Sequence, residues 1–436
     1  MVATSRSTTR SIEQWLEYIS SVHPREIELG LERTRRVADK LQIGKIAPLV
    51  ITVAGTNGKG SCVASMEAIL QHAGYKTAAY TSPHIHCFNE RIRVESAAVN
   101  DETLINAFAD IDRCRGDDSL SYFEFATLAA LHIFNKAQLD IVLLEVGLGG
   151  RLDAVNIIDP DVAVISNISI DHEDWLGSGI ENIAAEKAGI LRENTPVVYG
   201  ELSVPDNITR KADELNSPLY RLGRDFGFSI EPDSGCWTWN GVDASQGVIQ
   251  FKDLTRPNLA LVNVSVALQA LALLPIELSL QGVNEALKGL LLPGRFELRQ
   301  DCKTSTSLIF DVAHNAAATE LLAENLRQYK KENPKIQRVI MVLAVMADKD
   351  IEAMISSLES CFDFWYIAQV EVARCMPAQE VTQRINSSCK GLNLLQFDSV
   401  IDAYHAACEQ ATEQDVVVVT GSFFTVAAVR ELSLPV

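Results

Sequence analysis

The stretch from residue 49 to residue 74, "LVITVAGTNGKGSCVASMEAILQHAG", decides the fold. An apolar run of strand length leads into a glycine-rich loop, and a segment with helical periodicity follows and closes at Gly74. Glycines at positions 55, 58 and 60 allow the backbone to bend closely around an anion. The free N–H groups at the start of the helix add a partial positive charge. The strand, loop and helix together predict a phosphate-binding site.

This loop differs from the usual phosphate-loop pattern. The pattern G-x-x-x-x-G-K-[ST], with its lysine on Lys59, needs glycine at position 53 and serine or threonine at position 60. The chain has Val53 and Gly60 instead. Two interpretations remain: a different loop whose lysine faces nucleotide phosphates, or a tight turn with a solvated lysine. The strand before the loop and the helix after it favour the first.

Composition limits the classes of function. A chain of 436 residues is expected to form more than one domain. Its formal charge of −19, from 57 acidic and 38 basic residues, repels nucleic acid phosphates, so we expect no nucleic acid partner. The nine cysteines are scattered and form no C-x-x-C pair, which is typical of a reducing compartment.

We also expect no membrane partner and a cytoplasmic location. The first residues contain no apolar segment of the kind that a secretory signal has. The longest apolar region is interrupted by Asn263, Gln269 and Pro275. It is therefore interpreted as a buried helix and not as a membrane span.

The distribution of apolar runs predicts an α/β protein with two domains. Runs such as "LVITVAG", "DIVLLEVG", "DVAVISNIS" and "TPVVYG" alternate with helical segments, as a parallel sheet covered on both faces requires. Residues 215–255 alternate with turn residues and predict antiparallel hairpins. After Pro293 the alternation restarts with "SLIFDVAHN" and "RVIMVLAVMADKD". We therefore predict domain 1–293, with a mostly parallel sheet plus a small antiparallel sheet, and a smaller Rossmann-like domain 294–436.

Polar residues follow several predicted strands, where ligands of α/β sheets bind. Ser82, Glu145 and His172 supply a hydroxyl, a carboxylate and an imidazole, a mixture that suits Mg²⁺ bound partly by water and nucleotide oxygens. Each also has a structural explanation: a turn cap, a carboxylate bonded to backbone amides, and a core histidine. Their joint occurrence beside a phosphate loop favours the metal, because a buried carboxylate without a partner is costly.

Several motifs together resemble one family. "GTNGKGS", "LEVGLGGRLDAVN", "DHEDWLG…EKAGI", "PGRFE" and "DVAHN" occur in order over nearly the whole chain. They resemble the bacterial dihydrofolate synthase/folylpolyglutamate synthases, which belong to the Mur ligase superfamily of ATP-dependent amide-bond ligases. In that family the phosphate loop is shorter, with a glycine between the lysine and the serine, as Gly60 stands here between Lys59 and Ser61. The difference from the usual pattern is therefore expected, and the resemblance implies a Mur ligase-type ATPase domain at residues 1–293.

The resemblance implies roles for individual residues. The ATP site would comprise Thr56, Asn57, Gly58, Lys59, Gly60, Ser61, Asn263, Arg295 and Asp311. The Mg²⁺ ligands would be Ser82, Glu145, His172 and, as a carbamate, Lys187. The pterin site would comprise Glu26, Ile27, Glu28, Leu29, Phe123 and Asp153. The residues closest to the chemistry would be Lys59, Lys187 and His314.

The resemblance also implies the reaction. L-Glutamate would be joined to 7,8-dihydropteroate, and to the γ-carboxylate of reduced folates, through an acyl phosphate made with ATP. The cofactors would be ATP, Mg²⁺ at two sites and a monovalent cation, and the protein would act as a monomer. The alternatives are a synthase that acts only on folates, another Mur-type amino-acid ligase, and a nucleotide-dependent switch. Ala316, Ala344 and Val262 depart from the family's usual proline, glycine and proline, which affects loop details of the second domain and adenine contacts.

Overall fold

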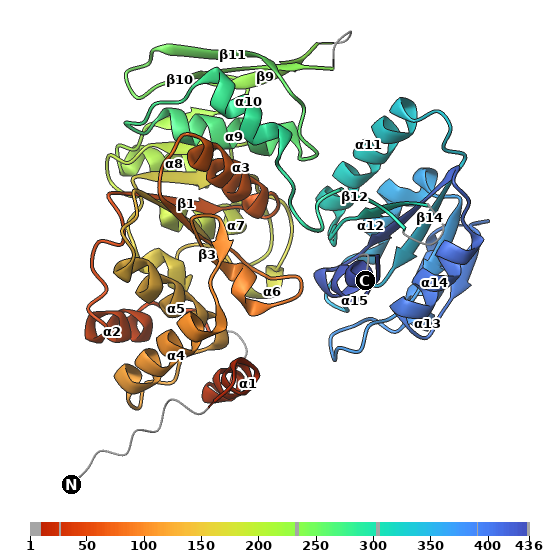
Figure 1. The fold of residues 1–436 in the computed structure, drawn as a ribbon, viewed down its shortest axis with the longest axis horizontal. Helices are drawn as coiled ribbons and strands as arrows, with labels where there is room; N and C mark the ends of the chain where they lie inside the picture. Colours follow the sequence, from red (N-terminus) through yellow and green to blue (C-terminus); the bar gives the residue numbers. More distant parts are fainter. Residues whose placement is uncertain (1–9, 26–27, 232–234, 302–305, 390, 434–436) are drawn as a thin grey trace. The chain divides into compact units, whose positions relative to one another are not determined.

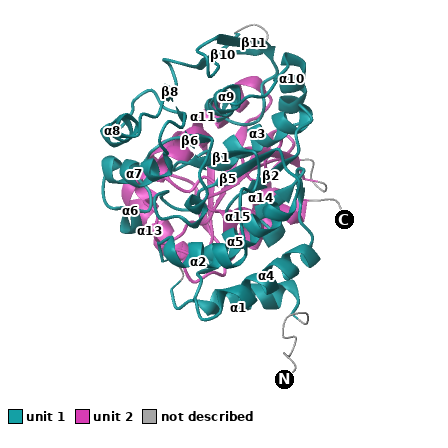
Figure 2. Cartoon of the chain, turned by 90° about the vertical axis from the view of Figure 1, so that its left-hand side faces the viewer, with its two compact units in different colours: residues 1–290 teal, residues 291–436 magenta. Residues whose placement is uncertain are grey.

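The computed structural model describes residues 10–25, 28–231, 235–301, 306–389 and 391–433. The chain forms two compact units, unit 1 (Met1–Leu290) and unit 2 (Leu291–Val436), which are coloured separately in Figure 2. This division falls close to the predicted boundary after residue 293. Each unit is built on its own sheet, and both are α/β structures (Figure 1).

The main sheet of unit 1 has eight strands in the order β4-β3-β2-β5-β1-β6-β7-β8. Their bounds are β1 Leu49–Ala54, β2 Thr77–Tyr80, β3 Ile92–Val94, β4 Ala97–Ala98, β5 Ile141–Glu145, β6 Val162–Ile165, β7 Val197–Tyr199 and β8 Leu219–Arg221. The strands from β2 to β8 in this order are parallel, while β3 and β4 are antiparallel at one edge. The mostly parallel sheet is thus confirmed. Strand β8 lies in the region predicted to form antiparallel hairpins, but it pairs with β7 in parallel instead.

Helices cover both faces of this sheet (Figure 1). Helices α3 (Lys59–His72) and α9 (Leu261–Ala272) pack against each other on one face, and α5 (Tyr122–Lys136) and α7 (Ile180–Lys187) belong to clusters on the other. Side chains on both faces of β1 are buried, which accounts for its continuous apolar run. The other helices are α1 Ile12–Val22, α2 Glu32–Lys40, α4 Asp101–Arg115, α6 Glu173–Leu176, α8 Asp206–Glu214 and α10 Leu280–Lys288.

A small antiparallel sheet packs on α9. It comprises β9 Gly227–Ile230, β10 Trp237–Val242 and β11 Val248–Leu254, in the order β11-β10-β9. The indole N–H of Trp239 donates to the carbonyl of Ser265 at 3.2 Å, and the Gln269 amide bonds both backbone groups of Val242. These contacts bury α9, as predicted. Among the described residues, no helix is both long enough and apolar enough to cross a membrane.

Unit 2 has six strands in the order β12-β13-β17-β14-β15-β16, all parallel except β12. The strand bounds are β12 Glu297–Gln300, β13 Ser307–Phe310, β14 Arg338–Leu343, β15 Phe364–Ile367, β16 Leu394–Gln396 and β17 Asp415–Thr420. The helix bounds are α11 Ala316–Glu332, α12 Ile351–Leu358, α13 Ala378–Ser388, α14 Val400–Gln410 and α15 Phe423–Arg430. Helices α11 to α13 cover one face of the sheet and α14 and α15 the other. This arrangement confirms the predicted second α/β fold.

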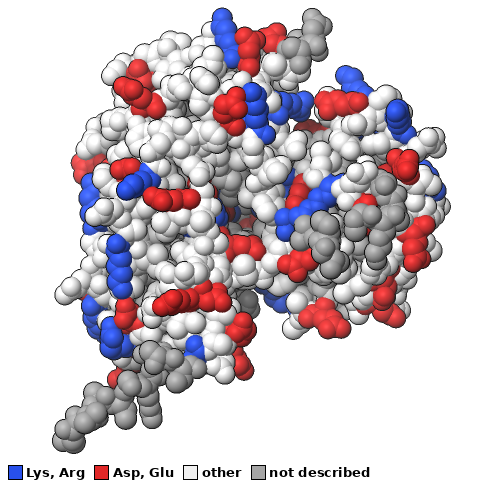
Figure 3. Space-filling view, in the orientation of Figure 1, with Lys and Arg blue, Asp and Glu red and all other residues white. Residues whose placement is uncertain are grey.

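Charged side chains are distributed over the surfaces of both units. On the face shown in Figure 3, red acidic side chains lie beside blue basic ones over both units. With a formal charge of −19, the chain as a whole repels anions. A phosphate-bearing ligand must therefore be bound by local positive groups. In α/β sheets such ligands bind at the carboxyl ends of the parallel strands.

Candidate active site

The glycine-rich loop joins β1 to α3, as predicted. Helix α3 begins at Lys59, and Gly58 precedes it with a φ of +81°. A Cβ atom on Gly58 would lie 2.4 Å from Oδ1 of Asn263, so the start of α9 packs directly on the loop. The ammonium of Lys59 donates to the carbonyls of Gly55 at 3.0 Å and Thr56 at 3.2 Å. The structure thus brings Lys59 and Asn263, both predicted to bind ATP, to the same loop.

The segment after β6 holds this loop in shape. The N–H groups of Thr56 and Asn57 donate to the backbone and side-chain oxygens of Asn167, at 3.0 and 2.8 Å. The hydroxyl of Ser166 donates to the carbonyl of Asn57 at 2.6 Å. A Cβ atom on Gly55 would lie only 1.9 Å from this hydroxyl oxygen. Ser166 and Asn167 are absent from the predicted site, although two polar residues directly after an apolar strand are a signal for them.

A buried carboxylate lies beside the loop. Glu145 ends β5 and is only 5% exposed. Its Oε2 accepts the N–H of Ser82 at 3.2 Å, and a Cβ atom on Gly60 would lie 3.7 Å from the same oxygen. The ends of β2 and β5 therefore bring Ser82 and Glu145 to the phosphate loop, as predicted.

His172 lies directly before a short helix, with its side chain partly exposed. It precedes α6 with a φ of +55°, its side chain is 44% exposed, and its Nε2 lies 3.9 Å from Asp171 Oδ2. Within the described ranges, no group of three or more His, Cys, Asp and Glu side chains could hold a metal ion. A metal beside Glu145 would therefore need other oxygen ligands, such as a hydroxyl, water or phosphate, which Mg²⁺ accepts.

Lys187 is a buried amine near the phosphate loop. It ends α7 and is 3% exposed, and a Cβ atom on Gly150 would lie 3.1 Å from its carbonyl oxygen. Burial and the positive charge of Lys59 lower the pKa of Lys187 to about 7, against the opposing effect of the Asp171 and Asp153 carboxylates. Lys59, Asp171 and Asp153 therefore all affect the charge of the Lys187 amine.

Asp153 organises the glycine-rich turn after β5. Its Oδ2 accepts the N–H groups of Gly147 at 3.0 Å and Leu148 at 2.8 Å, and its Oδ1 accepts that of Val155 at 3.0 Å. Burial raises the pKa of Asp153 to about 6, although these amides favour the charged form. A Cβ atom on Gly147 would lie 2.5 Å from the ring of Phe123. Phe123 and Asp153, both predicted to contact the pterin, thus meet at one turn.

The predicted pterin segment 26–29 is described in part. Glu26 and Ile27 lie outside the described residues. Gly30, directly after the other two, donates its N–H to the carbonyl of Leu152 at 3.3 Å. Because Leu152 precedes Asp153, this bond joins the segment to the turn that Asp153 organises.

In unit 2, Asp311 fixes the segment that carries Arg295. The Asp311 carboxylate accepts the N–H of Phe296 at 2.8 Å and that of Ala313 at 2.9 Å. Burial raises its pKa, while the positive charge of Arg295 acts in the opposite direction. The predicted ATP residues of this unit, Arg295 and Asp311, therefore lie together at the carboxyl end of β13.

An aromatic side chain joins Arg295 to His314. The guanidinium of Arg295 lies 5.1 Å from the ring centroid of Phe423, and the His314 ring lies 6.2 Å from the same ring. Nδ1 of His314 lies 2.8 Å from the carbonyl oxygen of Val312. Phe423 is not among the predicted residues. Its signal is the run "GSFF" after β17, in which Gly421 has a φ of +109°.

Comparison with known proteins identifies the family. The Mur ligase middle domain matches residues 53–224, and the Mur ligase glutamate ligase domain matches residues 294–423. The dihydrofolate synthase/folylpolyglutamate synthase of Escherichia coli K12 is 41% identical over 421 residues, which cover 97% of this chain and 95% of that protein. The chain belongs to the Mur ligase family.

Solved structures of similar proteins share this fold. An E. coli FolC in complex with DHPP and ADP is 40% identical, with a TM-score of 0.90, and the match covers 98% of this chain and 99% of that one. A bifunctional folylpolyglutamate synthase/dihydrofolate synthase with Mn, AMPPNP and L-glutamate bound is also 40% identical, with a TM-score of 0.88 over 99% and 100% of the chains. The family resemblance and the enzyme class predicted from the motifs are confirmed: this Mur ligase is an ATP-dependent dihydrofolate synthase/folylpolyglutamate synthase.

Proposed function

We propose that this Mur ligase joins L-glutamate to 7,8-dihydropteroate, and to the γ-carboxylate of reduced folates, through an acyl phosphate. A carboxylate is a poor acyl donor because its oxygen is a poor leaving group. Phosphoryl transfer from ATP converts it into an acyl phosphate, which the glutamate amine attacks to give an amide, with ADP and phosphate as products. The observation that carries the proposal is the packing of the phosphate loop against the buried Glu145 carboxylate in unit 1.

This proposal assigns nine residues to the binding of ATP. The ATP phosphates are bound by the loop residues Thr56, Asn57, Gly58, Lys59, Gly60 and Ser61. Further contacts with ATP come from Asn263, Arg295 and Asp311. Their work is positioning and neutralisation of the charge that develops on the transferring phosphoryl group. His314 acts near the reacting carboxylate. The packing of Asn263 on Gly58, and the shared position of Arg295 and His314 against Phe423, support these roles.

The proposal includes two Mg²⁺ sites and a monovalent cation. The Mg²⁺ ligands are Ser82, Glu145, His172 and carbamylated Lys187. The buried Glu145 carboxylate beside the loop fits a hard cation, which when bound neutralises phosphate charge. At Lys187 the neutral amine bonds to the carbon of carbon dioxide and loses a proton, which gives an anionic carbamate. The conversion replaces a cation that would repel Mg²⁺ with an oxygen ligand.

The acceptor site of the proposal lies at the turn after β5. It comprises Glu26, Ile27, Glu28, Leu29, Phe123 and Asp153. The support is the contact of Phe123 with Gly147 and the bond from Gly30 to Leu152, which bring two parts of this set to the same turn.

The proposal also gives each of the two domains a function. Residues 1–293 bind ATP and the pterin, and residues 294–436 form the glutamate ligase domain. The protein works as a monomer in the cytoplasm. The family matches to 53–224 and 294–423 support this division.

The test is ATP-dependent incorporation of labelled L-glutamate, with dihydropteroate and tetrahydrofolate as separate acceptors. We expect incorporation into both, with ADP formed in equal amount. Incorporation into tetrahydrofolate alone would favour the folate-only synthase. Hydrolysis of ATP that is independent of glutamate would favour a nucleotide switch and contradict the proposal.

A further inference from the structure

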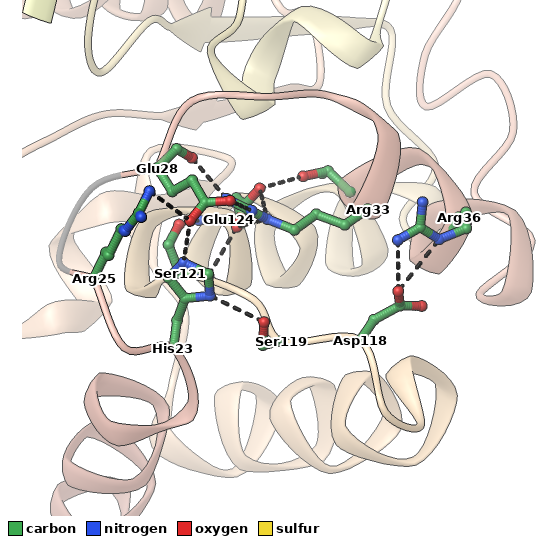
Figure 4. Close-up of polar contacts among 10 residues, drawn as sticks. His23, Arg25, Glu28, Arg33, Arg36, Asp118, Ser119, Ser121 and Glu124 are labelled. Atoms are coloured by element: carbon green, nitrogen blue, oxygen red, sulfur yellow. Dashed lines mark hydrogen bonds and ion pairs between the residues drawn. The ribbon is translucent and has the colours of Figure 1, made fainter.

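One buried carboxylate joins the starts of two helices in unit 1 (Figure 4). Glu124 lies in the first turn of α5 and is 3% exposed. Its oxygens accept Nε of Arg33 at 2.7 and 2.8 Å, the hydroxyl of Thr34 at 3.0 Å and the N–H of Ser121 at 2.8 Å. Because a buried polar group without partners is costly, these four hydrogen bonds stabilise the buried carboxylate, and the geometry they impose is stiff.

Arg33 extends this network to a second carboxylate. Its Nη1 donates to Oε1 of Glu28 at 2.5 Å, and its Nη2 donates to the Glu28 carbonyl at 2.7 Å. The side chain of Arg33 is 15% exposed, and that of Glu28 is 35% exposed. The other oxygen of Glu28 lies 3.0 Å from Nε2 of His23, which lies before the same segment (Figure 4). One guanidinium therefore joins two acidic side chains and one backbone carbonyl.

Glu28 belongs to the proposed acceptor site, and Glu124 adjoins another member of it, Phe123. Glu28 precedes Leu29 and Gly30, and Gly30 bonds Leu152 of the turn after β5. Glu124 follows Phe123, whose ring contacts Gly147 of the same turn. A shift of either segment would require the guanidinium to release hydrogen bonds to a partly or fully buried acid.

We infer that Arg33 is a positioning residue for the pteroate acceptor: it holds the segment at Glu28 in register with the start of α5 that carries Phe123. The inference rests on the proposed acceptor site. Arginine is required because its planar fork bonds two partners at once. A lysine keeps the charge and reaches Glu124 or Glu28, but cannot bond both in this geometry.

The test compares Arg33→Lys with Arg36→Lys. Arg36 lies one turn further along α2, and its side chain is 56% exposed. Within the described residues, the hydrogen bonds of this side chain go to the Asp118 carboxylate. We expect Arg33→Lys to raise the KM for dihydropteroate roughly tenfold, which corresponds to about 1.4 kcal/mol. The KM for ATP and the Kd for AMPPNP should stay within about twofold, and Arg36→Lys should change none of these constants. A parallel rise in both KM values, or an unchanged KM for dihydropteroate, would overturn the inference.

Two further variants separate a failed inference from a failed acceptor site. Phe123→Leu tests the site itself, since an unchanged KM for dihydropteroate in that variant would move the site elsewhere. Glu28→Gln removes the ion pair between Arg33 and the Glu28 side chain and leaves the buried pair of Arg33 and Glu124 intact. If Glu28 acts through Arg33, the double variant Glu28→Gln/Arg33→Lys should raise KM no more than the larger single change. Additive effects would mean that the two residues act independently and would refute the positioning role.

Discussion

Two glycines at opposite ends of α3 allow a direct test of the phosphate loop. Gly58 precedes the helix with a φ of +81°, and Gly74 follows it with a φ of +85°. An alanine at either position would adopt the same left-handed conformation. The surroundings differ, because a Cβ atom on Gly58 would lie 2.4 Å from Oδ1 and 2.8 Å from Cγ of Asn263, whereas one on Gly74 meets nothing within 4 Å. Gly74→Ala is therefore the matched control for Gly58→Ala.

The expected magnitudes follow from this difference. Left-handed backbone costs alanine about 1–2 kcal/mol, and Gly74→Ala should lower the free energy of unfolding by this amount alone. At Gly58 the overlap with Asn263 adds about 1–3 kcal/mol, as overpacking in a tight interior does. Gly58→Ala should therefore cost about 2–5 kcal/mol. Relief of the overlap also moves Asn263 away from the loop, so this variant should bind AMPPNP at least about tenfold more weakly.

Urea unfolding at constant m-value and calorimetric titration with AMPPNP measure the two effects separately. Gly74→Ala should shift the unfolding midpoint and keep the wild-type affinity for AMPPNP. Gly58→Ala should shift the midpoint further and weaken the nucleotide. If the two variants lost the same stability and bound AMPPNP equally well, the contact between Asn263 and the loop would not determine loop stability or nucleotide affinity, and the reasoning would be refuted.

Four other changes test separate parts of the structure. Lys59→Ala should lower kcat/KM for ATP roughly 100-fold, because a charge beside the phosphates is lost, while the protein stays folded and its urea midpoint falls only through the loss of the two hydrogen bonds from Lys59 to the loop. Lys187→Ala should lose most activity, and added acetate should restore part of it by supplying a carboxylate; full activity without acetate would contradict the carbamate. Asp153→Asn should lower the free energy of unfolding by about 1–3 kcal/mol, because an amide cannot accept all three N–H groups that the carboxylate accepts. Although burial acts in the opposite direction, hydrogen bonds and charges of two arginines hold the pKa of Glu297 below its usual value. Its stabilising effect should therefore be complete above the unfolded-state pKa of about 4.3 and be lost as the pH falls through the lowered folded-state pKa; in Glu297→Gln that part of the pH dependence of unfolding should disappear.

The main features of the fold could be predicted because burial on both faces leaves a clear pattern. The apolar runs at 49–55, 140–147, 161–169 and 195–200 all contain parallel strands, since both faces of the sheet are covered and bury mostly apolar side chains. The pattern failed at Leu219–Arg221, which lies within the predicted hairpin region but joins the parallel sheet at its edge. A three-residue strand has too few side chains to show which partner it pairs with, and that choice depends on contacts with β7.

The candidate site could be predicted where a motif is contiguous in the sequence, and not where it depends on contacts through space. The loop residues, Glu145 and Lys187 lie within recognisable runs. Asn167 bonds Asn57 across 110 residues, and Arg33 bonds Glu124 across 91. A separation of this length leaves no local periodicity, so only the folded chain reveals the pair. Phe423 is intermediate, since its strand end is visible in the sequence but its contacts are not.

The supporting residues outside the motifs share one physical role. Loops cannot complete the hydrogen-bond ladders that hold strands and helices, so a loop that must keep its shape needs partners from another segment. Ser166 and Asn167 supply them to the phosphate loop, and Arg33 supplies them to the segment at Glu28. In a chain with a formal charge of −19, long-range attraction does not bring anions to the site. Affinity for phosphate and carboxylate groups must then come from short-range geometry, which is why substitutions behind the loops, and not only those within them, should weaken substrate binding.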